Sequence, residues 1–347
     1  MGYGEYCVQD QKDYSAYLYI IPASLVILLF HVFPVVYSFL LSVFRGTLKH
    51  PMKYFIGFEN YVELFQDIEF WRAMLNTLFF SIMSVPMGIL IALGIALLLN
   101  QKIKGLGIYR TIYYLPVITS IAAVALVWKW LFDNKSGFFN QLFGFFNQLL
   151  EMIGVDYSIT PSLWLSESRG IFQVILGWMS IDLPQYIQLF GGDFDQVVTR
   201  LIHGPSVALC CIIVMSVWKV LGYNVVIFLA GLQNIPTQLY EAAEIDGAGS
   251  FQQFKNVTWP LLSPTTFFIF IMSTISSFQV FVQVFMMTPF GGPDRSTSVV
   301  VFYLYEKAFK TFEFGYAAAM AYVLFTIIFV LTLLQKKYVG EKVHYGG

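Results

Sequence analysis

Long apolar runs alternate with short polar segments along this chain, and the runs are long enough to cross a bilayer. A helix rises 1.5 Å per residue, so about 20 consecutive apolar residues span a hydrocarbon core of roughly 30 Å. We expect one membrane-spanning helix from each of the residue ranges 17–44, 74–99, 109–131, 206–231, 265–288 and 316–334. The pattern therefore predicts an all-α polytopic membrane protein with six spans.

The first apolar run follows a polar tail at residues 1–16 and contains no Asp, Glu, Lys or Arg between residues 17 and 44. A run of this length exceeds the apolar core of a signal peptide, so we expect it to stay in the protein as the first span. Residues 45–72 then form a polar loop before the second span. Residues 17–131 hold the first three spans, and residues 206–334 hold the last three.

The longest segment between predicted spans is residues 132–205. Its sequence Phe-Phe-Asn-Gln-Leu occurs at 138–142 and again seven residues later at 145–149. This aromatic repeat favours an amphipathic helix, which either lies on the bilayer surface or packs on the spans. Residues 171–190 are apolar enough to suggest a seventh span, but Asp182 at its centre would cost about 2.5–3.5 kcal/mol. We therefore predict a large external loop with amphipathic helices.

A polar, charged stretch at residues 236–264 separates the fourth and fifth runs. Pro236 suits the first turn of a short helix, because its missing N–H does no harm there. Asp246-Gly247 is a turn dipeptide, and glycine readily adopts the left-handed conformation that ends a helix. Ser250 is the expected N-cap of a second short helix. The stretch predicts a helix-turn-helix knuckle that projects from the membrane domain.

Composition narrows the class of protein. Of the 347 residues, 57% are hydrophobic and only 12% are charged, as suits a polytopic membrane protein. The net charge of -1 gives no global field that would attract nucleic acid. The three cysteines and four histidines have no metal-binding or disulfide spacing, and no phosphate-binding loop or nucleophile elbow is present. We predict that the chain is not an enzyme and holds no metal or cofactor.

The knuckle resembles the coupling loop, or EAA loop, of permease subunits in bacterial ABC importers. The residues at the family spacing are Glu241, Ala242, Ala243, Asp246, Gly247, Ala248, Phe254, Pro260 and Pro264. Other segments are similar to carbohydrate-uptake permeases, namely Trp218-Lys219, Gly222-Tyr223-Asn224, Ala230-Gly231-Leu232-Gln233 and Gly291-Gly292-Pro293. The Gly-Gly-Pro segment resembles the first of the two non-identical maltose-type or multiple-sugar-type permeases. Val282 departs from the pattern, since an acidic residue is frequent there.

The resemblance implies a type I ABC importer permease fold of six spans, with a cytoplasmic coupling helix and an enlarged external loop. It places the chain in the bacterial cytoplasmic membrane with both tails, 1–16 and 335–347, in the cytoplasm. The implied partners are a cytoplasmic ATPase dimer that binds ATP and Mg²⁺, a second permease and an extracytoplasmic solute-binding protein. The external segment 132–205 is hypothesised to contact the binding protein or the second permease.

Polar residues inside the fourth and fifth apolar runs are candidates for the substrate pathway. An ionisable group such as Lys219 within a membrane is a functional hypothesis by default, and the alternative is a lysine that snorkels outward or pairs structurally. Three serines on the fifth run fall at i, i+3 and i+4 and so share one helix face. Hydroxyl and amide groups suit sugar recognition, but they also join helices within membranes. The candidates are Lys219, Tyr223, Asn224, Ser273, Ser276, Ser277 and Gln279.

The sequence therefore predicts a permease subunit of an ATP-driven, binding-protein-dependent importer of a sugar or oligosaccharide. Glycerol phosphate or another polar solute is the alternative substrate within this class. An ion-coupled secondary transporter is the alternative from another class, but it would commonly show inverted repeats, and none is clear here. A membrane enzyme would need a convergent cluster of titratable groups, which is not visible.

Overall fold

The computed structural model describes residues 15–46, 49–101, 105–152, 163–179, 181, 183–184, 186–187, 189, 191–192 and 194–342. This part of the chain is almost entirely helical. Its only sheet is an antiparallel pair of two-residue strands, the hairpin of β1 (Phe44–Arg45) and β2 (Tyr54–Phe55). Five of the described helices are long and apolar enough to cross a membrane, or six if one bent pair counts as a span. The predicted all-α polytopic class is confirmed.

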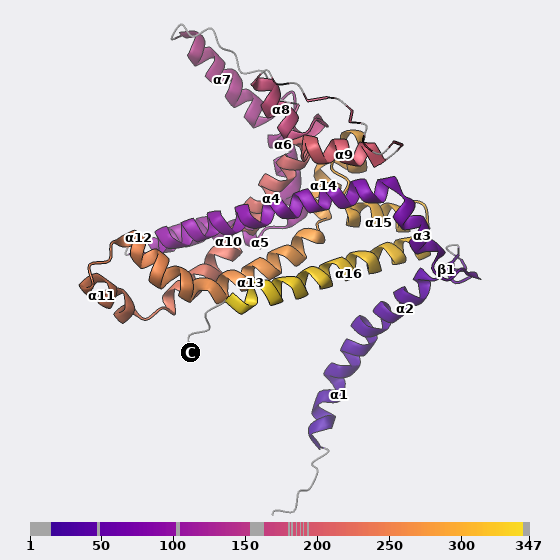
Figure 1. Ribbon diagram of the computed structural model, residues 1–347, viewed down its shortest axis with the longest axis horizontal. Helices are drawn as coiled ribbons and strands as arrows, with labels where there is room; N and C mark the ends of the chain where they lie inside the picture. Colours follow the sequence, from indigo (N-terminus) through magenta and orange to yellow (C-terminus); the bar gives the residue numbers. More distant parts are fainter. Residues whose placement is uncertain are drawn as a thin grey trace, which may run out of the picture.

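Four long helices lie side by side and form the centre of the molecule (Figure 1). Small residues such as Ala92 and Ala96 are fully buried, which lets neighbouring helices approach closely, and Phe228 and Leu262 fill the space between them. These central helices are α4 (Ile68–Leu99), α10 (Val207–Gln233), α13 (Trp259–Phe278) and α16 (Phe314–Tyr338).

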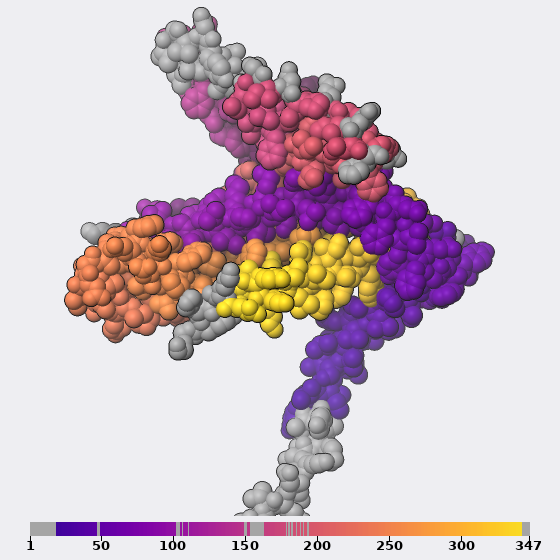
Figure 2. Space-filling view, viewed as in Figure 1, coloured from indigo at the N-terminus to yellow at the C-terminus, as the bar shows by residue number. Residues whose placement is uncertain are grey.

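The first predicted span projects away from these central helices (Figures 1 and 2). The C-terminal half of this span packs on α16, where the Tyr322 hydroxyl donates to the carbonyl of Val35. Its apolar side chains, such as Leu25 and Phe30, are more than half exposed in the isolated chain, as suits a helix surrounded by lipid or by another chain. The span consists of α1 (Ser15–Ile27), the π-helical turn η1 (Leu28–Val32) and α2 (Phe33–Ser42).

The third predicted span, 109–131, is not one straight helix. It divides into α5 (Leu106–Ile118) and α6 (Ile121–Leu131), which meet at an angle of 99°. Thr119 and Ser120 between them have extended backbone, with ψ of 150° and 131°. Pro116 lacks an N–H for the last turn of α5, and the Thr119 hydroxyl bonds back to its carbonyl at 2.7 Å. These local bonds compete with helix continuation and produce the elbow.

The fifth predicted span, 265–288, also differs from expectation. Its helix begins earlier and ends at Phe278, and the separate helix α14 (Val282–Met287) follows. Near the break, the hydroxyls of Thr274 and Ser277 donate to the carbonyls of Phe270 and Thr274 at 2.8 and 2.7 Å. Such back-bonding bends helices, and Phe281 then leaves helical geometry with φ of -143°.

The predicted external segment is largely helical where it is described, and it covers one end of the central helices (Figure 1). Trp164 packs against Phe132 and Phe143, so the aromatic repeat helix is joined to the spans at its start. In the apolar stretch considered as a seventh span, the residues that the structure describes include one helix of eight residues, and Asp182 lies outside the described residues. The helices are α7 (Phe138–Met152), η2 (Trp164–Ser166), α8 (Ile171–Trp178) and α9 (Phe194–His203).

Asp67, the N-cap of α4, fastens three helices together at this same end. Its carboxylate accepts the N–H of Glu69 at 2.9 Å and the hydroxyls of Tyr303 and Tyr316 at 2.6 Å each. Burial beside this carboxylate raises the pKa of Tyr303. The remaining elements are α3 (Glu59–Gln66), η4 (Pro289–Gly291), η5 (Pro293–Arg295), α15 (Val300–Phe309) and η6 (Gly340–Lys342).

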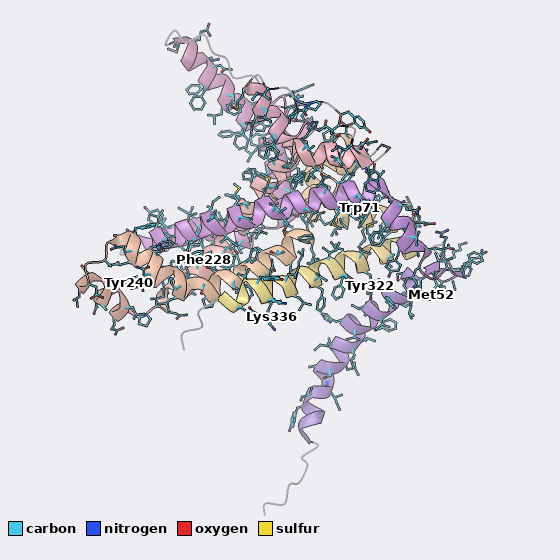
Figure 3. The ribbon with its side chains drawn as sticks, viewed as in Figure 1. Met52, Trp71, Phe228, Tyr240, Tyr322 and Lys336 are labelled. Carbon is cyan, nitrogen blue, oxygen red and sulfur yellow. The ribbon has the colours of Figure 1, made fainter. Side chains whose placement is uncertain are left out.

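The molecule thus has two distinct ends. Figure 3 places Tyr240 at one end and Trp71 and Met52 towards the other. The first end carries the knuckle at residues 236–264, and the second carries the hairpin, α3 and α15.

Candidate functional site

The knuckle is a helix-turn-helix unit, as the sequence predicts. Its first helix, α11 (Thr237–Ile245), begins directly after Pro236, and Gly247 adopts a left-handed φ of +78° just beyond its end. The N–H of Gly247 donates to Glu244 O at 3.0 Å, and the N–H of Ala248 donates to Ala243 O at 2.9 Å. These two bonds form a Schellman motif, which satisfies carbonyl groups at the helix end.

The second helix of the knuckle starts one residue earlier than predicted. The N-cap of α12 (Ser250–Gln253) is Gly249 and not Ser250, and the Gln252 side chain accepts the Gly249 N–H at 3.0 Å. Gln252 at the third helical position thus satisfies the N–H of the N-cap residue, as in one half of a capping box. The chain continues through the π-helical turn η3 (Phe254–Thr258) into α13 without leaving helical geometry.

Contacts between the two arms hold the knuckle in place. The Tyr240 hydroxyl lies 3.0 Å from Thr258 Oγ1, and Phe254 and Val257 pack against the same apolar cluster as Tyr240. Phe254, a predicted ATPase contact, is half-buried and also contacts the ring of Trp259. Phe254 and the half-buried Pro260 therefore join the knuckle to the span beneath it.

The outward face of the knuckle combines acidic and apolar side chains. Of the predicted coupling residues, Glu241, Ala242, Asp246 and Gly247 are exposed, while Ala243 and Ala248 are half-buried. Ile245 and Phe251 on either side of the turn are 87% and 76% exposed, and neither was among the predicted coupling residues. The sequence could have indicated them, because two large apolar residues flank a turn in a polar loop. Exposed apolar groups ringed by charge are typical of a protein-binding surface.

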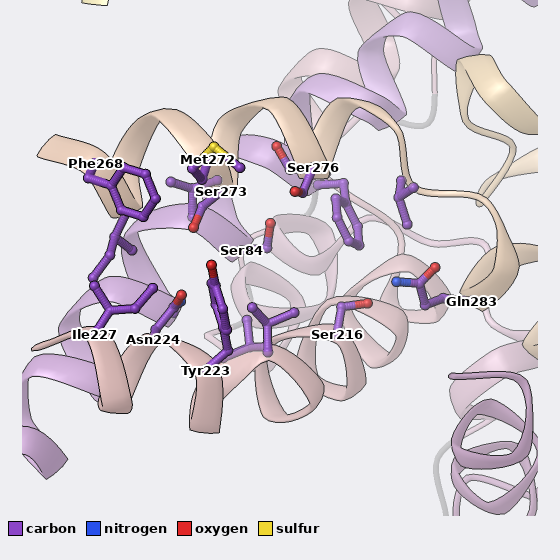
Figure 4. Close-up of a pocket in the computed structure, with 18 residues that line it drawn as sticks. Ser84, Ser216, Tyr223, Asn224, Ile227, Phe268, Met272, Ser273, Ser276 and Gln283 are labelled. Carbon is purple, nitrogen blue, oxygen red and sulfur yellow. The ribbon is translucent and has the colours of Figure 1, made fainter. Parts of the chain in front are cut away.

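A cavity of about 350 Å³ lies between α4, α10 and α13. Figure 4 shows Tyr223 pointing from α10 towards Ser273 on α13, with Ser84 of α4 close by. The Ser277 hydroxyl, which donates to its own helix, lies 2.7 Å from Ser81 Oγ and can accept the Ser81 proton, so this pair joins α13 to α4 at the cavity wall. No lining residue that the structure describes is charged. The polar lining residues are Ser84, Ser216, Tyr223, Asn224, Ser273, Ser276, Ser277 and Gln283.

The structure brings five of the seven predicted pathway residues to this cavity and leaves two away from it. Gln279 caps α13 and is exposed, whereas Gln283, one turn further on, faces the cavity. Gln283 lies seven residues after Ser276, a spacing that keeps a side chain on the same helix face, whereas Gln279 does not fall at a face spacing from the three predicted serines together. Ser84 and Ser216 were missed because single serines in apolar runs are common. A role for any of these residues in binding substrate stays a prediction.

Lys219 does not line the cavity. Its ammonium group donates to the carbonyls of Pro116 and Val117 on α5, at 2.7 and 3.1 Å. Of the two interpretations that the sequence left open, this geometry corresponds to the structural pairing.

The opposite end of the molecule carries a polar hollow of about 500 Å³ beside α9. Arg200 donates from Nη2 to Asp294 O at 2.6 Å, and Arg72 and Arg295 lie on its rim. Burial, together with the nearby charge of Arg72, lowers the pKa of Arg200. Among the described residues, no group of three or more His, Cys, Asp and Glu could hold a metal ion.

The chain was compared with known proteins. The family model described as "binding-protein-dependent transport system inner membrane component" matches residues 70–339. A probable ABC transporter permease protein of Bacillus subtilis is 31% identical over 95% of this chain and 97% of its own length. The lactose transport system permease protein of Rhizobium radiobacter is 32% identical, with 93% of each chain covered.

More distant matches extend the comparison. The sn-glycerol-3-phosphate transport system permease protein of Yersinia pestis is 28% identical over 84% of this chain and 82% of its own length. A solved bacterial alginate ABC transporter, in complex with an alginate pentasaccharide-bound periplasmic protein, has a chain of the same fold. It matches with a TM-score of 0.68 and 22% identity, covering 94% of both chains.

Proposed function

The chain belongs to the binding-protein-dependent transport system inner membrane component family, and from this premise we propose that it is one half of the membrane pathway of an ATP-driven sugar importer. It is a multi-pass membrane permease of the ABC transporter class. The observation that carries the proposal is the family match across both the cavity helices and the knuckle. ATP and Mg²⁺ would bind to a separate ATPase subunit, so this chain would supply motion and a pathway but no chemical step.

The knuckle is proposed to dock into a cleft on the cytoplasmic ATPase. Its helix ends are closed by backbone hydrogen bonds and its base is anchored through Tyr240, so it can transmit force as a rigid body. Ile245 and Phe251 would enter an apolar pocket, while Glu241 and Asp246 would make polar contacts around it. This orientation puts the knuckle and the end of α16 in the cytoplasm, with both chain termini on that side.

Charging the knuckle tip should release the ATPase. Exposed apolar anchors at protein interfaces contribute about 2 kcal/mol or more each, so Ile245→Asp and Phe251→Asp should each weaken binding about 30-fold. The measurement is co-purification of the ATPase with the tagged chain from mild detergent. Phe309→Asp at the opposite end, 60% exposed, is the matched control and should retain the ATPase. Undiminished binding by both single variants would contradict an apolar anchor.

The cavity is proposed to take a neutral sugar. Its polar lining consists of hydroxyl and amide groups, which can donate to and accept from sugar hydroxyls. Among the described lining residues no cation is available for a phosphate or carboxylate, because the ammonium of Lys219 is engaged by α5. Glycerol phosphate is therefore the less favoured substrate, although one relative carries that name. The second permease would line the other side of the pathway.

Removing one cavity hydroxyl should slow uptake. Tyr223→Phe leaves the ring in place but removes a group that could bond a sugar hydroxyl, a loss of about 1.4 kcal/mol, or tenfold in transport rate. Uptake of labelled sugar into vesicles with excess ATP measures the effect. Tyr54→Phe, in the exposed hairpin, is the matched control and should transport normally. Normal uptake by Tyr223→Phe would indicate that this hydroxyl does not contact the substrate.

A solute-binding protein is proposed to deliver the sugar at the end opposite to the knuckle. Such a protein could contact the polar hollow beside α9 and the helices α8 and α9 themselves. The function as a whole is tested by reconstituting the chain with its partner permease, ATPase and binding protein. Uptake should require ATP and the binding protein together. Uptake by the lone chain without ATP would favour a secondary transporter instead.

A further inference from the structure

The elbow between α5 and α6 presents a physical problem that the chain has to solve. The last carbonyls of α5 have no partner within their own helix, because the helix ends at Ile118. In a bilayer each unsatisfied carbonyl is costly, since lipid offers no hydrogen-bond donor. The Thr119 hydroxyl supplies one local donor, to the carbonyl of Pro116, so the other carbonyls of this last turn require donors from a neighbouring element.

Helix α10 supplies that donor and holds both halves of the elbow. Lys219 donates to the carbonyls of Pro116 and Val117 in the last turn of α5. Its neighbour Trp218 packs on Trp128 of α6, with ring centroids 5.6 Å apart. The positive charge also complements the negative end of the α5 helix dipole.

The backbones of α5 and α10 touch one turn further along. A Cβ atom added to Gly222 would lie 2.2 Å from the carbonyl oxygen of Tyr113, so only glycine permits this approach. Two turns of α10 therefore carry three residues that contact the two helices of the elbow, namely Trp218, Lys219 and Gly222. We call these three residues the elbow grip.

Helix α10 also connects the elbow to the two parts of the proposed machinery. Ser216, Val220 and Tyr223 lie along α10 at helical spacing and line the cavity. The C-terminal end of α10, at Gln233, leads within three residues to Pro236 and the first helix of the knuckle. Any displacement of the knuckle is therefore transmitted along the helix that carries the elbow grip.

We propose that Lys219 is a positioning residue for transport, whose ammonium group fastens the elbow to α10 so that elbow and knuckle move as one body. The proposal rests on the function proposed above. Lys219 does not touch the sugar; it acts through the carbonyls of Pro116 and Val117. Without it, ATP hydrolysis would still move the knuckle and α10, but the elbow would not follow, and cycles would be completed without transfer of sugar.

The test is the number of sugar molecules taken up per ATP hydrolysed by the reconstituted complex. Lys219→Met keeps the length and apolar stem of the side chain but removes all donors. We expect this variant to assemble with the ATPase and to hydrolyse ATP, while the ratio of sugar to ATP falls at least about tenfold, because both charge-assisted hydrogen bonds to α5 are lost. Lys219→Arg keeps donors that can reach two carbonyls and should restore most of the ratio.

Matched controls separate this role from general effects. Lys337→Met makes the same change on the exposed end of α16 and should leave the ratio unchanged. An unchanged ratio in Lys219→Met would overturn the proposal. If Lys219→Met does not assemble, Lys219→Gln is measured in its place, and failure of both to assemble would show a purely structural role and also overturn it. Absence of ATP-driven uptake in the wild-type complex would instead overturn the proposed function.

Discussion

Replacing Gly247 with proline is expected to separate the chain from its ATPase and abolish uptake, while the membrane helices remain folded. Gly247 has a φ of +78°, whereas the proline ring fixes φ near -65°. Proline also lacks the N–H that donates to Glu244 O at 3.0 Å. The Schellman motif cannot then close, so α11 loses its fixed end and Ile245 is no longer presented beside Phe251. Co-purification of the ATPase and ATP-dependent uptake measure the two effects.

The same substitution two residues later is the control. Gly249 has a φ of -70°, which proline can adopt, and it occupies an N-cap position, as Pro236 does at the preceding helix. Gly249→Pro removes only the exposed bond to Gln252, so most ATPase binding should persist. Gly247→Ala should be intermediate, because the left-handed conformation costs alanine about 1 kcal/mol and open space surrounds the site. Equal binding by both proline variants would mean that the turn geometry is not what the ATPase recognises.

The knuckle could be predicted from sequence because its determinants are local. The helix start at Pro236 and the left-handed turn at Gly247 depend on intrinsic backbone preferences that need no tertiary contacts. The N-cap at Gly249 could not be predicted in the same way. Ser250 has the better capping side chain, but Gln252 reaches back to the Gly249 N–H and shifts the helix start by one residue.

The two broken spans were beyond prediction from apolar runs alone. Hydropathy measures transfer into lipid and contains no information on helix direction, so a 99° elbow and a straight helix give the same profile. The bend at Thr119 is tolerated because Lys219, a hundred residues later, bonds the freed carbonyls. Likewise, the apolar run gives no sign that α13 ends at Phe278 and that the separate helix α14 follows. Long-range partners decide such features.

The largest structural effect is expected at Gly315, where α16 begins. A Cβ atom there would lie 2.0 Å from the carbonyl oxygen of Phe44 and 3.1 Å from Asn60 Nδ2. Asn60 is buried and donates to the carbonyls of Ser42 and Phe44, so it cannot withdraw without leaving those carbonyls unsatisfied. Gly315→Ala therefore forces apart the C-terminal end of the first span and the N-terminal end of the last span. Such overpacking costs about 3 kcal/mol.

Thermal unfolding of the detergent-solubilised chain measures this effect. It is monitored as the loss of the monodisperse peak in size-exclusion chromatography after heating. With an unfolding entropy of about 2.1 cal/mol/K per residue, a loss of roughly 3 kcal/mol should lower the midpoint of this 347-residue chain by about 4 °C. Gly94→Ala is the matched control, since Gly94 is also helical but no atom lies within 4 Å of its added Cβ. Alanine is the better helix former, so this control should match or slightly exceed the wild-type midpoint. A wild-type midpoint in Gly315→Ala would show that α2 and α16 are not in backbone contact, and the anchoring of the first span would need another explanation.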